Sequence, residues 1–321
     1  MPGFDLPYQP IRRELYAPAE LFKGFDSKDK TSWGKTDDFK IYCHFVIKGS
    51  SAPTDPYEGM MQALHDNSIT QSTYSIIKDR KVAAIMGDHE LRRDTPAYRD
   101  VALLARRLTQ NGFLMCTGGG PGTMEAVHFG ALLAARNYSD LDFDKMLIRL
   151  KTQPVLPPHL EKIVVLNDGK LKVDQELVAH AHAWFEPAYS IYSEISAPSQ
   201  SLAVPTWNYG QEPTTPFATR TAKYFQNSIR EDGLLALAKH GIIFSQGKAG
   251  TIQEIFQNAT QNFYNTFHYF SPMVLLGVEY WEKTYPVVGV LRKIFSTDFN
   301  KHLLVTDNIK DAAEFIERYI P

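Results

Sequence analysis

Two segments of this chain share one pattern, in which a short apolar run, a glycine-rich turn and a stretch of helical periodicity follow one another directly. The first is FLMC (113–116) with TGGGPGTMEA (117–126), and the second is GIIF (241–244) with SQGKAGTIQE (245–254). Apolar runs of this length are typical of buried strands, and the glycines mark a turn into a helix. Strand, turn and helix in that order are the repeating unit of a parallel α/β sheet. The chain is therefore expected to adopt an α/β fold.

The remaining sequence continues this alternation. Thr95 or Asp94 can cap a helix that ends at Gly112, because Pro96 suits its first turn and glycine its end. Further strands are expected at 81–87, 201–205, 272–277 and 302–306, and further helices at 122–136, 217–239, 251–265, 280–294 and 308–319. The sum predicts a Rossmann-like, doubly wound parallel sheet in a three-layer α/β/α arrangement.

Two regions depart from the alternation. Residues 1–79 are rich in proline, aspartate, lysine and aromatics, and predict an N-terminal arm that packs on the core, with one or two short helices at 57–79. Residues 80–321 are expected to form the nucleotide-binding domain. Within it, 137–200 reads as an insertion or lid, with a hairpin at 163–173 that turns at Asn167-Asp168-Gly169.

Charge and composition exclude several classes of protein. The net charge is −2, and we find no lysine or arginine run that would follow a nucleic-acid backbone, so a polynucleotide partner is not expected. The chain has two cysteines and shows no signal core and no apolar run near the roughly 20 residues of a membrane span. A cytoplasmic protein without a membrane partner is expected. His180 and His182 do not share a helix face, and no metal site is predicted.

The glycine-rich turns predict an anion site. The first amides of a helix lack partners inside the helix and carry the positive end of its dipole, so they attract phosphate. Missing side chains allow phosphate oxygens to approach, and threonine hydroxyls add donors. We therefore interpret the turns as one phosphate-holding device used twice, made by Gly118, Gly119, Gly120, Gly122, Thr123, Gly247, Gly250 and Thr251. The alternative is that the glycines only make tight turns. Neither turn contains the GK[ST] of a P-loop or a complete G-x-G-x-x-G.

Other polar residues are expected beside the turns. Glu125 and Glu254 lie in the first turns of the two helices, where they would face a ligand held on the neighbouring amides. Gly87, with Asp88 and His89, follows the strand at 81–87 and reaches the same edge of the sheet. The loop at 206–218 is placed to recognise a base with Tyr209 or Gln211, or is simply stiffened by proline.

These motifs resemble those of a known family. GGGPGTMEA resembles the GGGxxGxM element, and GKAGTIQE the PGGxGTxxE element, of the Lonely Guy (LOG) family of nucleoside 5'-monophosphate phosphoribohydrolases, once called lysine decarboxylases. TGGGPGTMEA and the HGII run at 240–243 are more similar still to bacterial nucleotide 5'-monophosphate nucleosidases. The likeness spans about 80–320. No pyridoxal-lysine context supports lysine decarboxylation.

The resemblance implies an enzyme that hydrolyses the N-glycosidic bond of a nucleoside monophosphate to free base and ribose 5-phosphate, without a cofactor. It implies that Glu254 stabilises the ribosyl cation and orients water, that Gly250 and Thr251 hold phosphate, and that an arginine assists the base. Arg230 is the candidate, although ungapped counting reaches Glu231, and Arg220 is a second possibility. A homodimer is also implied.

One further departure from the family pattern keeps other functions open. Gln246-Gly247-Lys248 stands where the family has Pro-Gly-Gly, and Lys248 either contacts phosphate or obstructs it. The alternatives to a nucleosidase are a nucleotide-sensing protein without catalysis and a carrier of a phosphorylated pterin, similar to molybdopterin carriers.

Overall fold

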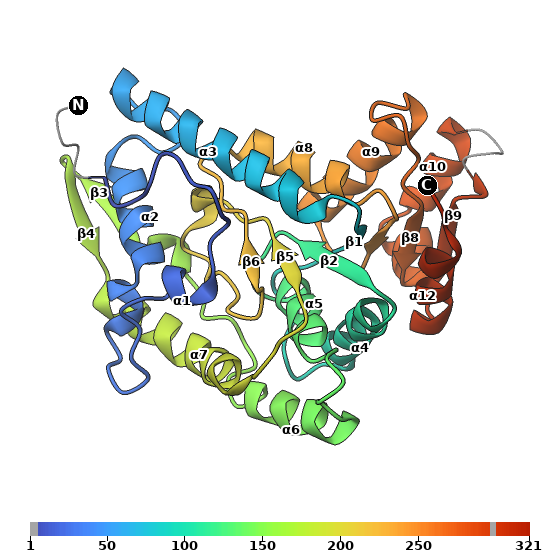
Figure 1. Cartoon of the computed structure of the whole chain (residues 1–321), viewed down its shortest axis with the longest axis horizontal. Coiled ribbons are helices and arrows are strands. Elements are labelled where there is room, and N and C mark those ends of the chain that lie inside the picture. The colour runs from blue at the N-terminus through green and yellow to red at the C-terminus, as the bar shows by residue number, and fades with distance from the viewer. Residues whose placement is uncertain (1–5, 296–299) are drawn as a thin grey trace.

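A computed structural model describes residues 6–295 and 300–321 of the chain. A sheet of seven strands forms its centre in the order β6-β5-β2-β1-β7-β8-β9, and each neighbouring pair is parallel (Figure 1). The predicted doubly wound parallel sheet is confirmed. Its strands are β1 (Lys81–Met86), β2 (Phe113–Thr117), β5 (Ser201–Ala203), β6 (Arg220–Thr221), β7 (Ile242–Phe244), β8 (Met273–Leu276) and β9 (Leu303–Thr306).

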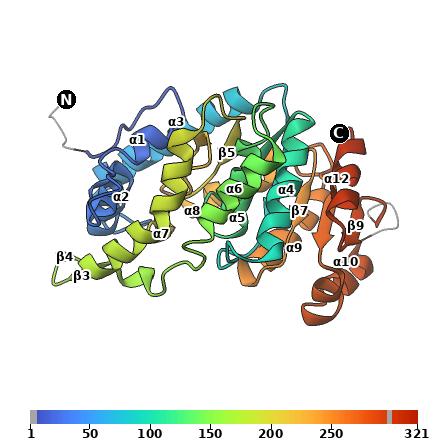
Figure 2. The same ribbon diagram turned by 90° about the horizontal axis from the view of Figure 1, so that it is seen from below.

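Helices cover both faces of the sheet and make three layers (Figures 1 and 2). Val82 and Ala84 of β1 join the apolar core on one face, whereas Ala83 and Ile85 join the core on the other. This division follows from the strand, whose successive side chains point to opposite sides. The first face carries α3 (Pro56–Ile77), α8 (Asn227–Leu237) and α9 (Ala249–Phe263), and the second carries α4 (Pro96–Gln110), α5 (Thr123–Leu132), α6 (Asp140–Leu150) and α12 (Ile309–Arg318).

The N-terminal region packs on the core but is more helical than the sequence predicts. It contains α1 (Pro18–Leu21), η1 (Ser32–Lys35) and α2 (Asp37–Ile47), and α3 is one helix of 22 residues instead of one or two short ones. Thr36 caps α2 by accepting a hydrogen bond from the amide of Phe39. Tyr16 pairs with Thr221 at the edge strand β6. The region therefore also covers an open edge of the sheet.

The predicted insertion is part of the packed structure. It contains α6, η2 (Leu160–Lys162), a hairpin of β3 (Val164–Asn167) and β4 (Lys170–Val173), and α7 (Gln175–Glu194). The hairpin prediction is confirmed, and Asp168 and Gly169 both have positive φ, as its two-residue turn requires. Phe143 of α6 and Ala188 of α7 are completely buried in the core. The segment is therefore not a free lid.

Two predicted helices are wrong in part. The helix expected at 217–239 begins only at Asn227, because residues 220–221 pair with β5 at the edge of the sheet. The helix expected at 280–294 is split into the π-helical turn η4 (Tyr280–Thr284) and α10 (Val287–Ile294). Pro286 stands between them, and proline lacks the amide that a continuous helix needs.

The connections identify where the winding of the sheet reverses. From β1 the chain moves outward through β2, β5 and β6, and then returns to β7, on the other side of β1, before it continues to β8 and β9. In such sheets, ligands bind beyond the carboxyl ends of the strands at the reversal. A ligand-binding site is therefore expected at the carboxyl ends of β1 and β7.

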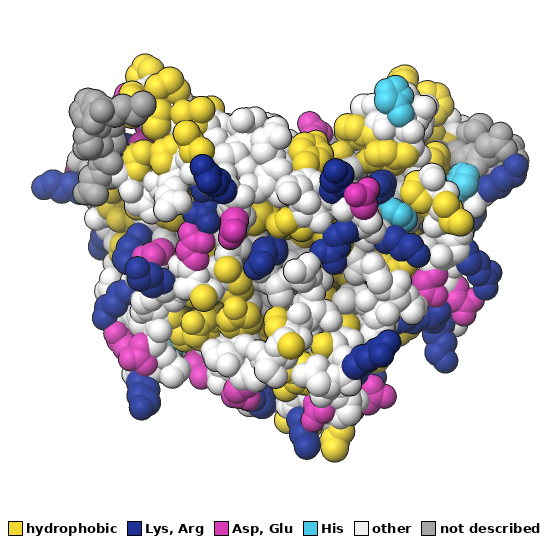
Figure 3. Space-filling model, in the orientation of Figure 1, with side chains coloured by type: hydrophobic (Ala, Val, Ile, Leu, Met, Phe, Trp, Pro, Cys, Tyr) yellow, Lys and Arg dark blue, Asp and Glu magenta, His cyan; other side chains and the backbone are white. Residues whose placement is uncertain are grey.

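On the face drawn in Figure 3, basic and acidic side chains are interspersed and do not form separate tracts. Within residues 6–295 and 300–321, none of the helices combines the length and the apolar character needed to cross a bilayer.

Candidate functional site

A cavity of about 450 Å³ lies at the carboxyl ends of β1 and β7. It is formed by the loop after β1, the start of α9, one side of α8 and the loop that follows η3 (Trp207–Tyr209). The lining residues are Gly87, Asp88, His89, Glu90, Met124, Tyr209, Glu212, Arg230, Glu231, Lys248, Ala249, Gly250, Thr251, Gln253 and Glu254. The cavity thus lies at the expected position in the sheet and contains both predicted catalytic residues.

The second glycine-rich turn presents unpaired amides to this cavity. The first hydrogen bond within α9 runs from the amide of Ile252 to the carbonyl of Lys248, so the amides of Ala249, Gly250 and Thr251 have no partner among the described residues. Apart from Gly250 itself, its chain neighbours and the adjacent backbone of its own helix, no described atom lies within 4 Å of the place where a β-carbon of Gly250 would project. Gly247 is needed for a different reason, since a β-carbon there would collide with the hydroxyl of Thr251. The N-terminus of α9 has the geometry of an anion site.

The first glycine-rich turn is built differently from the second. The amide of Gly119 donates to Thr117 Oγ1 at 3.0 Å, and that of Gly120 faces Met124 Sδ at 3.4 Å. The amide of Thr123 donates to the carbonyl of Asp88 at 2.9 Å. Glu212 Oε2 lies 3.4 Å from where a β-carbon of Gly120 would stand. Three amides of this turn are thus engaged within the fold and a carboxyl lies nearby, which makes it a poorer anion site than the start of α9. Phosphate binding at this turn stays a prediction.

Gly122 and Thr123 therefore shape the sheet edge and do not line the cavity. A β-carbon on Gly122 would collide with the backbone of Asp88 and His89, so glycine is required for the close approach of these loops. The hydroxyl of Thr123 is buried beneath Gly87 and has no hydrogen-bond partner among the described residues. Gly87 itself lines the cavity, as predicted.

The expectation that Glu125 faces a ligand is wrong. Its carboxylate is completely buried and receives two hydrogen bonds from the guanidinium of Arg93, at 2.8 and 2.6 Å. Tyr98 donates a further hydrogen bond at 3.0 Å. Arg93 uses its third nitrogen to reach the carbonyls of Gln153 and Trp184. Glu125 thus holds the loop after β1 against α5 and α7, and its role is structural.

Arg230 is the arginine that enters the cavity. It lies on α8, its Nε donates to the carbonyl of Val204 at 2.9 Å, and its guanidinium rests on Gly118, where a side chain would collide with it. Arg220 instead projects from the edge strand β6, is exposed, and bonds the carbonyl of Thr219. Glu231 borders the cavity and accepts from Asn227 and Gln253. Of these residues, Arg230 supplies the positive charge.

Glu254 lies one helical turn beyond the amides at the start of α9. Its side chain is half-buried, and burial raises its pKa to about 7, with Glu231 acting in the same direction and Arg230 opposing both. A carboxyl group with its pKa raised toward neutrality suits acid–base chemistry at that pH.

Lys248 does not fill the anion site. Its exposed side chain forms an ion pair with Glu90 at 2.8 Å, between the start of α9 and the loop after β1. The space beside the amides of Ala249 and Gly250 stays open. Lys248 therefore does not obstruct the anion site, which was one of the two roles that the sequence allowed for it.

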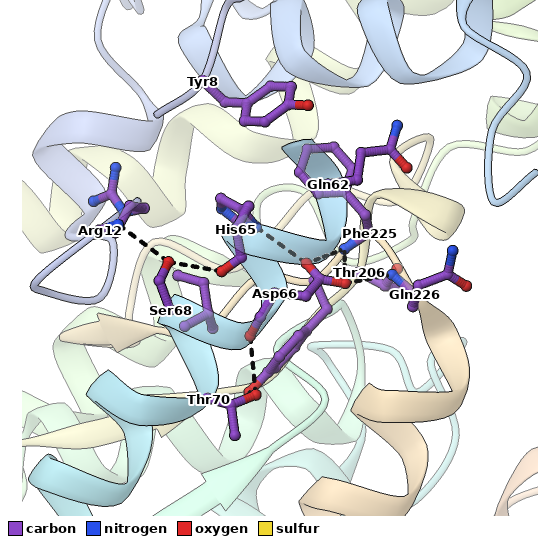
Figure 4. A network of polar contacts seen from close by, with 12 residues as sticks. Tyr8, Arg12, Gln62, His65, Asp66, Ser68, Thr70, Thr206, Phe225 and Gln226 are labelled. Atoms are coloured by element: carbon purple, nitrogen blue, oxygen red, sulfur yellow. Dashed lines mark hydrogen bonds and ion pairs between the residues drawn. The ribbon is translucent and has the colours of Figure 1, made fainter. Parts of the chain in front are cut away.

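A buried polar network fixes the helix that carries Arg230 (Figure 4). Asp66 of α3 accepts hydrogen bonds from the amides of Phe225 and Gln226, each at 2.9 Å, at the start of α8. His65 donates to Asp66 from Nδ1 at 3.0 Å and accepts from the hydroxyl of Tyr16 at 2.8 Å. Burial lowers the pKa of His65, which keeps the ring neutral. The N-terminal region thereby contributes to the position of Arg230.

Sequence reasoning missed several residues of the cavity, and Glu212 is the one that bears on the chemistry. Glu212 follows Tyr209 and Gln211, which were selected for base recognition, in the same loop. Tyr209 lines the cavity, whereas Gln211 borders a neighbouring hollow. A glutamate between a glutamine and a proline has no periodic or motif signal, and only the fold of the loop brings it into the site.

No known family model and no curated protein matches the sequence. The X-ray structure of TM1055, a structural-genomics target, aligns over 74% of this chain and 99% of that chain, with a TM-score of 0.43 and 17% identity. At that level the likeness carries no argument about function. The Rossmann-like fold group follows from the sheet itself, and membership of the LOG family stays a prediction.

Proposed function

We propose that this protein binds a nucleoside 5'-monophosphate in the cavity and hydrolyses its N-glycosidic bond. The observation that carries the proposal is the relation between the unpaired amides at Ala249–Thr251 and the carboxyl of Glu254. Gly250 and Glu254 are four residues apart on one helix face, a rise of about 6 Å. This is comparable with the span from the 5'-phosphate of a nucleotide to its anomeric carbon. A phosphate on the amides would thus bring that carbon to Glu254.

The chemistry follows from the charges. Departure of the base leaves positive charge on the ribose, which the carboxylate of Glu254 stabilises more strongly as the charge develops. Water adds to the anomeric carbon and gives a proton to Glu254. Arg230, held by Val204 and Gly118, faces the same space and is placed to hold the substrate or the leaving base.

The direct test is release of free base, measured by chromatography after incubation with AMP, GMP, CMP and UMP. We expect release from at least one monophosphate and much less from the corresponding nucleoside, which lacks the group that the α9 amides would hold. Binding of monophosphates without any release would reject hydrolysis and favour a nucleotide-sensing protein.

Substitution of Gly250 tests the anion site separately from catalysis. Gly250→Asp places a carboxylate in open space beside the amides, so we expect monophosphate binding to weaken by about 30-fold or more, because about 2 kcal/mol of charge-assisted hydrogen bonding is lost. Calorimetric titration with AMP and with inorganic phosphate measures the effect. Gly289→Asp, at an exposed position of α10 with equally open space, is the control and should bind normally. Unchanged binding by Gly250→Asp would place the phosphate elsewhere.

We also propose that the protein is a homodimer. Phe263 and Tyr264 at the end of α9 are 53% and 72% exposed, and Ile294 of α10 is 56% exposed. Large apolar side chains gathered at a surface are typical of subunit contacts. Light scattering is expected to give twice the chain mass for the wild type and the single mass for Phe263→Asp/Tyr264→Asp. A monomeric wild type would refute the proposal.

A further inference from the structure

Glu212 occupies the end of the cavity that lies away from the start of α9. Besides the main cavity, it borders the niche formed by Gly118–Gly120 and a hollow of about 530 Å³ beside residues 155–161. The residues of α9 that line the main cavity border neither of these spaces. When a phosphate lies on the α9 amides, Glu212 is therefore at the opposite end of the bound molecule, where a nucleotide carries its base.

The carboxyl of Glu212 borders the cavity and has no structural hydrogen bonds within the described residues. Its side chain is half-buried. Burial raises the pKa of Glu212, whereas His89 and Arg230 act against this shift. A structural carboxylate such as Glu125 is fully paired, with Arg93 and Tyr98 as its donors. Glu212 differs in having free oxygens that face a cavity.

Departure of the base is assisted by a proton donor, and Glu254 does not supply that proton. The electron pair of the broken bond moves to the base, which leaves more easily when a proton arrives at the same time. Glu254 lies at the sugar, where it is required as a carboxylate. We propose that Glu212 is the general acid that protonates the departing base; this assignment rests on the proposed nucleotide hydrolysis.

The step is balanced with these two groups. The bond between the anomeric carbon and the base nitrogen breaks, and its electrons go to the base, which takes a proton from Glu212. Water forms the new carbon–oxygen bond and loses a proton to Glu254. Glu212 ends as carboxylate and Glu254 as acid, and exchange with solvent through the open cavity restores both. The products are free base and ribose 5-phosphate.

The test compares ordinary and activated leaving groups. In 7-methylguanosine 5'-monophosphate and nicotinamide mononucleotide the base is already positively charged and departs without a proton. Glu212→Gln is expected to lower kcat about 10²- to 10³-fold for whichever of AMP, GMP, CMP or UMP the wild type cleaves best, and less than about threefold for the activated substrates. Glu254→Gln should lose both reactions. Glu161→Gln, an exposed acid beside the same hollow, is the control and should lose neither.

Each result decides the role of Glu212. Equal loss on both substrate types, or no loss on either, overturns it while leaving the hydrolysis intact. A wild type that releases base from none of the substrates overturns the proposed function and the assignment together. If Glu212→Gln does not fold, as judged by circular dichroism, or if the wild type rejects the activated substrates, Glu212→Asp decides. Glu212→Asp keeps a carboxyl, whereas Glu212→Ala removes it. The assignment predicts that kcat of Glu212→Asp is at least tenfold higher than kcat of Glu212→Ala, and a smaller difference overturns it.

Discussion

Glu254→Gln is expected to abolish base release, with kcat reduced about 10³-fold or more, while binding of the monophosphate changes only a few-fold. The reason is that glutamine keeps the shape of the side chain but cannot carry the negative charge that stabilises the ribosyl cation. The unpaired amides of Ala249–Thr251, where we propose that the phosphate binds, are untouched. Chromatographic base release and calorimetric binding measure the two quantities on the same protein. An active Glu254→Gln would remove the central group of the proposed mechanism.

The same substitution is expected to stabilise the fold above neutral pH. Burial raises the pKa of Glu254 to about 7, so the folded protein holds this proton more tightly than the unfolded chain does. Ionisation of Glu254 therefore costs stability as pH rises from the pKa of the unfolded chain to about 7, and the full cost persists at higher pH. Glutamine removes that cost, which is about 1–3 kcal/mol. Denaturant unfolding should show Glu254→Gln more stable at pH 8 and equal to wild type near pH 4. Equal stability at both pH values would argue that Glu254 is solvated.

Glu125→Gln is expected to destabilise the protein by about 3–5 kcal/mol, because it leaves the buried guanidinium of Arg93 without a counter-charge. The double variant Arg93→Met/Glu125→Gln should lose less free energy of unfolding than the two single variants together. The reason is that no buried charge is then left without its partner. Urea unfolding at one pH measures all three. The expected loss is large because both side chains are almost completely buried.

An exposed pair supplies the control for this experiment. Arg99 and Asp144 form an ion pair at 3.1 Å, with 43% and 46% of their side chains exposed. Asp144→Asn should therefore cost less than about 1 kcal/mol. If Glu125→Gln proves as mild as Asp144→Asn and instead impairs nucleotide binding, Glu125 belongs to the site after all.

The local sequence pattern was sufficient to predict those strands and turns that are defined by their own residues. The apolar runs at 81–87, 113–116 and 241–244 lie at central strands of the sheet. Continuous apolar runs are what central parallel strands require, since both of their faces are covered. Asp168-Gly169 specified its hairpin turn in the same way. The edge strand β6 was missed, because two residues carry no periodic signal and the pairing with β5 alone makes them a strand.

The candidate site was only partly visible in sequence. Glu254 and Gly250 belong to one helix start, so their spacing of one turn could be deduced from the chain. Arg230 required the fold, because it reaches the cavity from α8 and depends on Val204, Gly118 and the anchoring of α8 by Asp66. Glu212 was missed because its position is set by a loop.

By itself, the sequence determined the alternation of central strands and helices, the glycine turns at their junctions and the unpaired amides at the start of α9, because these depend on neighbours within a few residues. Only the tertiary structure distinguished the two turns. Glu125 and Glu254 both lie in the first turn of a helix that follows a glycine-rich turn, one position apart when the two motifs are aligned. Yet Arg93 pairs with Glu125, and the open cavity borders Glu254. Whether an amide or a carboxylate is free to meet a ligand depends on partners that are distant in the chain, and folding alone brings those partners into contact.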